Sequence, residues 1–127
     1  MKRLVTLGVL LTSIAASAAS LPCSIHPKKG TPASNLSALA KVSLADARQV
    51  ALASIKAPPT STVGEGELEI EHGCLVYSFD IRVPGKSGIE EVMVDPGNGK
   101  VLSQKHESAR QEAAEQAKDK AARRKPQ

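Results

Sequence analysis

Residues Glu69–Ile81 read EIEHGCLVYSFDI, and the pattern of this stretch decides the fold. From the cysteine onward, side chains that suit a core alternate with side chains that suit a surface, as in a β-strand with one buried face. The expected core face consists of Leu75, Tyr77, Phe79, Ile81 and Val83. The opposite face consists of Cys74, Val76, Ser78, Asp80 and Arg82, and we expect Cys74 to lie there, outside the main core.

A second strand precedes this one across a tight turn. In Glu67–Glu71, Leu68 and Ile70 alternate with three glutamates, which is typical of a strand with one face in water. Glycine adopts positive φ freely and histidine does so more readily than most residues, so His72-Gly73 predicts a two-residue hairpin loop. We interpret the three glutamates as the solvated side of the strand rather than as an acid–base pair, because their environments look alike.

Further elements follow on both sides of the hairpin. A helix is predicted from Ser43, a good N-cap, to about Lys56, where Pro58 and Pro59 stop it. Its expected apolar face consists of Leu44, Ala47, Val50, Ala51 and Ile55. A third strand is predicted over Ile89–Asp95 and a short last strand over Lys100–Ser103. The predicted fold is α+β, with one N-terminal helix packed on a three- to four-stranded antiparallel sheet, over residues 43–103.

The two ends of the chain are predicted to lie outside this domain. Residues 1–18 combine Lys2 and Arg3, an apolar run and small residues ending at Ala18, which is typical of a secretory signal peptide. The run is shorter than the roughly 20 apolar residues of a spanning helix, so we expect an exported chain, periplasmic or secreted, that does not span the membrane. Residues 19–42 are predicted to be a linker, and residues 104–127 a charged, Ala-rich tail that is flexible or helical.

The scarcity of aromatic residues argues against a nucleic-acid partner, although the chain is basic. Without Lys2 and Arg3 the chain has 15 basic and 13 acidic residues, a formal net charge of +2. Residues 43–103 carry −4, and the segments on either side, 19–42 and 104–127, carry +3 each. Proteins that bind single strands stack bases on aromatic side chains, but this chain has one Tyr, one Phe and no Trp.

The helix SLADARQVALASI, the strand GCLVYSFDI and the segment EVMVDPGNGKVL together resemble the PepSY domain family over residues 42–104. The resemblance implies a helix packed on a small antiparallel sheet and offers no catalytic residues. Domains of this family occur in propeptides of secreted metallopeptidases and in small exported or membrane-attached bacterial proteins, and peptidase regulation has been proposed for them. This chain carries one copy and no peptidase domain, so we expect no action as a propeptide in cis.

The two cysteines have three possible uses. Export to an oxidising compartment, a small domain and a count of only two cysteines predict a Cys23–Cys74 disulfide. In the chain-entropy model such a cross-link stabilises the fold by about 4 kcal/mol. Free or intermolecular thiols are one alternative. The other is a tetrahedral metal site made by Cys23, His26, His72 and Cys74.

We therefore expect a non-enzymatic exported module that requires no cofactor. Its expected partner is a protein or peptide, with an exported peptidase as the candidate, bound at a free strand edge. The last strand and Glu67–Glu71 are both candidates for that edge, and the sequence does not choose between them. The alternative is a metal- or redox-handling envelope protein that uses the four-residue set.

Overall fold

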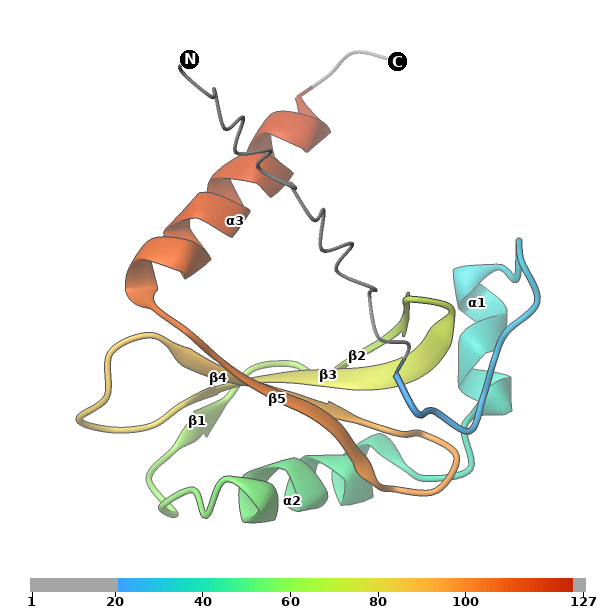
Figure 1. Ribbon diagram of the computed structural model, residues 1–127, viewed down its shortest axis with the longest axis horizontal. Helices are drawn as coiled ribbons and strands as arrows, with labels where there is room; N and C mark the ends of the chain where they lie inside the picture. Colours follow the sequence, from blue (N-terminus) through green and yellow to red (C-terminus); the bar gives the residue numbers. More distant parts are fainter. Residues whose placement is uncertain (1–20, 125–127) are drawn as a thin grey trace, which may run out of the picture.

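The computed structural model describes residues 21–124 and has the predicted α+β fold (Figure 1). Its strands are β1 (Thr62–Val63), β2 (Glu67–Glu71), β3 (Cys74–Arg82), β4 (Ile89–Val94) and β5 (Val101–Glu107). Its helices are α1 (Ala33–Leu36), the 3-10 turn η1 (Ser37–Leu39), α2 (Leu44–Ser54) and α3 (Ala109–Arg123). The strands form one antiparallel sheet in the order β1-β3-β4-β5, with β2 beside β1 along the same side of β3. The predicted signal peptide, residues 1–18, lies outside the described residues.

The predicted hairpin is confirmed. His72 has φ 49° and Gly73 has φ 80°, so both loop residues are in the left-handed region, as a type I′ turn requires. Beyond this turn Ile70 pairs with Leu75 and Leu68 with Tyr77. Direct cross-strand partners share a face, so this register sets Glu67, Glu69 and Glu71 on the face opposite Tyr77.

The core lies between α2 and one face of the sheet. Its buried members are Ala47, Ala51, Tyr77, Phe79, Ile81, Val92 and Val94. Helix α2 begins as predicted, because Ser43 Oγ accepts a hydrogen bond from the Asp46 amide at 3.1 Å. The prediction for Leu44 was wrong, because this residue is 38% exposed at the start of the helix. Tyr77 closes one end of the core by donating its hydroxyl to the Val42 carbonyl at 2.9 Å.

Residues 21–42, predicted to be a linker, are part of the folded unit. They contain α1 and η1, and Leu36 is buried. The reason lies in strand length: β4 pairs with β3 only from Tyr77 onward, so the first residues of β3 lack a partner on that side. Ile25 fills the gap, because its carbonyl accepts the Leu75 amide at 3.0 Å. We call residues 21–26 the N-terminal strap.

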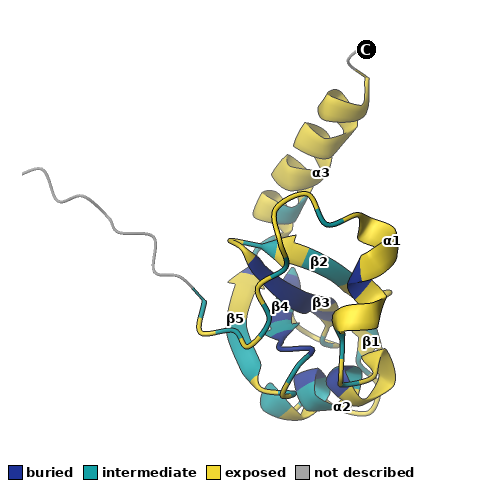
Figure 2. Ribbon diagram, turned by 90° about the vertical axis from the view of Figure 1, so that its right-hand side faces the viewer, coloured by how far each residue is buried: buried dark blue, intermediate teal, exposed yellow. Residues whose placement is uncertain are grey.

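The last strand is longer than predicted. It was expected to end at Ser103, but β5 continues to Glu107 because it pairs with β4 along the full length of that strand, down to Ile89. The charged tail beyond it is helical, as α3. This helix rises from the end of β5 on the side of the sheet opposite α2, and it buries none of its residues (Figures 1 and 2).

Strand β1 was not predicted, and a glycine explains how the chain forms it. Val63 lies opposite Ile81 and Glu67 opposite Ser78, so four steps along β1 and β2 match three steps along β3. The extra residue bends the chain away from the ladder at residues 64–66. There the backbone of Gly66 passes close to the ring of Phe79 and to a methyl group of Leu44, so a side chain at residue 66 would clash with both.

Gly66→Ala should lower the free energy of unfolding by about 1–3 kcal/mol, the usual cost of overpacking. A Cβ at residue 66 would lie 2.5 Å from Phe79 Cε1 and 2.7 Å from Leu44 Cδ1, and buried Phe79 has no room to retreat. Gly64→Ala is the matched control, because its Cβ would meet nothing closer than 3.6 Å. Urea unfolding followed by circular dichroism measures both. Equal losses from the two substitutions would contradict this account of the close approach.

Candidate functional site

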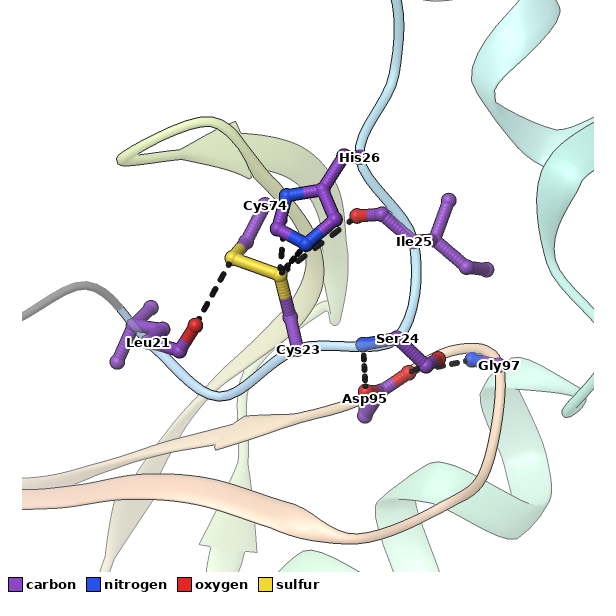
Figure 3. Close-up of a disulfide and its surroundings, with 8 residues drawn as sticks. All are labelled: Leu21, Cys23, Ser24, Ile25, His26, Cys74, Asp95 and Gly97. Carbon is purple, nitrogen blue, oxygen red and sulfur yellow. Dashed lines mark hydrogen bonds between the residues drawn. A yellow bond between two sulfur atoms is a disulfide. The ribbon is translucent and has the colours of Figure 1, made fainter.

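A disulfide joins the N-terminal strap to the start of β3. Cys23 and Cys74 are 51 residues apart in the sequence, and their Cα atoms lie 5.9 Å apart (Figure 3). Cys74 lies on the predicted face of β3, opposite the α2 core. It lies outside the main core, as predicted, but it is not exposed to solvent, since only 1% of its surface is accessible. Val76 on the same face is also buried, and the segment before α2 covers this end of the outer face (Figure 2).

Asp95 is the second attachment point of the strap. This side chain is fully buried at the end of β4 and accepts three short hydrogen bonds (Figure 3). Ser24 donates its amide to Oδ2 at 2.7 Å and its hydroxyl to Oδ1 at 2.6 Å, and the Gly97 amide donates to Oδ1 at 2.7 Å. Burial alone would raise the pKa of Asp95, but these hydrogen bonds outweigh burial and hold the pKa below its usual value.

The four residues of the alternative metal set do not come together. Cys23, His26 and Cys74 have their ligand atoms within 4.8 Å of one another, and both ring nitrogens of His26 lie 3.7 Å from Cys23 Sγ. His72 pairs instead with its neighbour Glu71, at 3.2 Å. Metal ligation by cysteine requires thiolates, and both sulfurs are joined to each other here, so this cluster offers a cation only one imidazole.

The remaining histidine also makes a surface contact. His106 Nδ1 lies 2.8 Å from Glu90 Oε1 across β4 and β5. Nucleophilic catalysis requires a nucleophile, a base and an orienting group held together. Across residues 21–124, none of the hydrogen bonds links a histidine to a serine or threonine hydroxyl.

The outer face of the sheet, which we define as the face opposite α2, is acidic where the N-terminal strap does not cover it. Glu69, Asp80 and Glu91 bring carboxylates from β2, β3 and β4 to this face, as the pairing Asp80–Glu91 shows. Partial burial raises the pKa values of all three carboxyl groups, and the negative charges of their acidic neighbours raise them further. Sequence reasoning did not find this surface, because it depends on the register of three strands.

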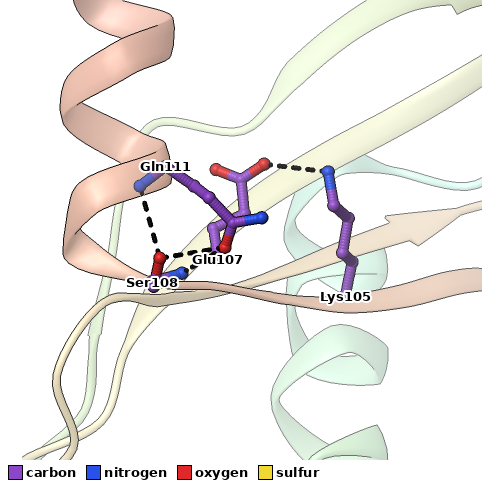
Figure 4. Close-up of polar contacts among 4 residues, drawn as sticks. All are labelled: Lys105, Glu107, Ser108 and Gln111. Carbon is purple, nitrogen blue, oxygen red and sulfur yellow. Dashed lines mark hydrogen bonds and ion pairs between the residues drawn. The ribbon is translucent and has the colours of Figure 1, made fainter.

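The junction of β5 and α3 forms one border of the outer face (Figure 4). Glu107 is only 3% exposed and pairs with Lys105 Nζ at 3.1 Å. Ser108 then starts α3 with a complete capping box: its hydroxyl accepts the Gln111 amide, and the Gln111 side chain accepts the Ser108 amide. Arg82 of β3 pairs with Glu112 in the first turn, so the base of α3 is held to the sheet.

The two candidate edges differ in what surrounds them. Strand β5 pairs only with β4 in the described sheet, and its residues 104–106 are exposed. Strand β2 is shorter and contacts α1, which lies beside the β2–β3 hairpin (Figure 1). The backbone of β5 is therefore the more accessible row of unpaired donors and acceptors.

The disulfide should stabilise the chain by about 4 kcal/mol, the value expected for a loop of this length. Purified protein should weigh two hydrogen atoms less than the dithiol form in mass spectrometry without reductant. Adding a dithiol reductant should lower its unfolding temperature. A Cys23→Ala/Cys74→Ala double variant is the control, because reductant should leave its unfolding temperature unchanged. A full dithiol mass would contradict the cross-link.

Asp95→Asn should cost about 2 kcal/mol of stability, because one of its oxygens becomes an amide group that faces N–H or O–H donors. The pKa of Asp95 is lowered in the folded chain, so its contribution is present above the unfolded value near 4 and is lost as pH falls through the folded value. The difference in the free energy of unfolding between wild type and variant should therefore become smaller as the pH falls. Glu65→Gln, an exposed control that makes none of the hydrogen bonds or ion pairs of the described residues, should change stability by less than about 0.5 kcal/mol. If this difference stays constant at all pH values at which the protein folds, Asp95 is not held as an ionised, hydrogen-bonded carboxylate.

Comparison with known proteins assigns the domain. A search among curated proteins and solved structures gave no match. Within the described residues, no helix is both long enough and apolar enough to cross a bilayer. The family model PepSY, described as "Peptidase propeptide and YPEB domain", matches residues 41–105, half of the chain, which include α2 and most of the sheet. The chain therefore belongs to the PepSY family.

Proposed function

We propose that this chain is an exported, non-catalytic binding module that takes up an extended peptide segment along β5 and thereby modulates an exported peptidase. The observation that carries the proposal is the free edge of β5, seven residues long and exposed at residues 104–106. A partner strand added there would gain a row of main-chain hydrogen bonds. Its side chains would then reach the neighbouring surface of the sheet.

Three further observations support this proposal. Domains of the matched family are propeptide-like regulatory modules, and a propeptide acts by contacting a peptidase. The Cys23–Cys74 disulfide fits an exported protein, since disulfides persist in oxidising compartments. The described histidines lie in surface ion pairs or beside the disulfide, which suits a binding role better than a catalytic one.

The backbone of β5 can be tested by proline substitution. Successive residues of an edge strand direct their amides alternately toward the neighbouring strand and toward solvent. Of Gln104→Pro and Lys105→Pro, one should therefore remove an outward donor at small cost in stability, and the other should break the ladder to β4. The first should weaken peptide binding about tenfold or more, as measured with extended peptides selected from a random library. Gln104→Ala and Lys105→Ala keep the amide and should bind normally.

Hydrogen exchange gives a second measurement on the same complex. A bound peptide should slow exchange of the outward amides of β5 and leave those of β2 unchanged. Slower exchange at β2 alone, or failure to select any peptide, would contradict strand addition at β5. The peptidase role has its own assay: adding the chain should lower hydrolysis of a fluorogenic peptide by a secreted metallopeptidase. Peptide binding without any change in hydrolysis would remove the peptidase from the proposal and leave the binding module.

A further inference from the structure

Helix α3 is long, exposed and attached only at its base. Its 15 residues include none that is buried, although Gln111 caps it and Glu112 ties its first turn to Arg82 (Figures 2 and 4). Beyond that turn it projects away from the sheet (Figure 1). Isolated helices of this length are only marginally stable in water, even when they are rich in alanine. A packing surface for its outer turns would therefore stabilise it.

The side chains of α3 are arranged for pairing with a helix of opposite direction. Ala109, Ala113, Ala117 and Ala121 recur every four residues and form a stripe of small side chains. An antiparallel partner copy centred on Glu115 would set Ala113 opposite Ala117 and Ala109 opposite Ala121. The same register sets acidic Glu112 opposite basic Lys118, but it also sets Arg110 opposite Lys120 and Glu115 opposite Glu115. The helix is thus complementary to itself in shape, and any attraction of charge must come from its basic end.

Among the described residues, the outer face of the sheet has no unpaired basic side chain where the base of α3 meets it. Its two basic side chains, Arg82 and Lys105, already pair with Glu112 and Glu107. No lysine or arginine among residues 21–124 forms an ion pair with Glu67, Glu69, Asp80 or Glu91. The outer half of α3 carries the opposite charge, with Lys118, Lys120, Arg123 and Arg124 against Asp119.

We propose that two copies of this chain associate about a two-fold axis, with the α3 helices antiparallel and the basic end of each helix over the acidic outer face of the other copy's sheet. Antiparallel packing brings the free end of one helix to the base of the other, which is where that acidic face lies. The contact is isologous, so each copy supplies both the basic helix end and the acidic face. It uses a different surface from the edge of β5 and does not depend on peptide binding there.

Sedimentation equilibrium of the purified chain at increasing concentration tests the association. Wild type should be a dimer that dissociates at high salt, because salt screens charge pairs near the surface. Arg123→Glu/Arg124→Glu should weaken association about tenfold or more, since repulsion replaces attraction at an exposed helix end that the fold does not need. Lys28→Glu/Lys29→Glu, the same change in charge near the N-terminal strap, should leave association unchanged.

Charge exchange between the two surfaces gives the sharper test. Asp80→Lys/Glu91→Lys should also dissociate the dimer, and combining it with Arg123→Glu/Arg124→Glu should restore association. Circular dichroism of each variant checks that the sheet still folds. If the Asp80→Lys/Glu91→Lys variant does not fold, the arginine variant on α3 still tests the proposal. A monomer at all concentrations would overturn the proposal. So would a dimer that both reversals leave intact, which would indicate association through the edge of β5 instead.

Discussion

Strand β3 must have hydrogen-bonding partners on both sides along nine residues, and no single strand in this small domain is long enough to supply either side. On one side, β2 pairs with Cys74–Ser78 and β1 with Ile81–Arg82, joined across the bend at residues 64–66. On the other side, β4 covers Tyr77–Ile81 and the N-terminal strap reaches Leu75. The backbone groups of this one strand are therefore paired by segments that lie both before and after α2 in the sequence.

The two faces of the sheet have different environments as a result. One face packs against α2 around Phe79 and forms a conventional apolar core. The outer face is divided: the segment before α2 covers Cys74 and Val76, while the part around Asp80 and Glu91 meets solvent. The uncovered part carries charges that burial and mutual repulsion disfavour, with raised pKa values at Glu69, Asp80 and Glu91. A surface of this kind favours contact with positive charge.

Local sequence patterns predicted the elements whose structure depends on near neighbours. The alternation through Tyr77 and Phe79, the His72-Gly73 turn and the Ser43 cap each act within a few residues, and each was read correctly. Local patterns did not predict that residues 21–42 belong to the folded domain. That segment follows no period, and its conformation depends on Asp95 and Leu75, which are 50 residues or more away along the chain. The length of β5 likewise follows from its pairing with β4, and the acidic outer face follows from the register of three strands.

The disulfide also changes how the domain would respond to mechanical load. Tension applied between residues 21 and 124 would pass from Cys23 directly into Cys74, so residues 24–73, with α1, α2, β1 and β2, would lie outside the path of the force. Only the chain from Cys74 onward could be drawn out. Helix α2 and strand β2 would stay within the covalent loop, so only about half of the described residues could be extended before a covalent bond had to break.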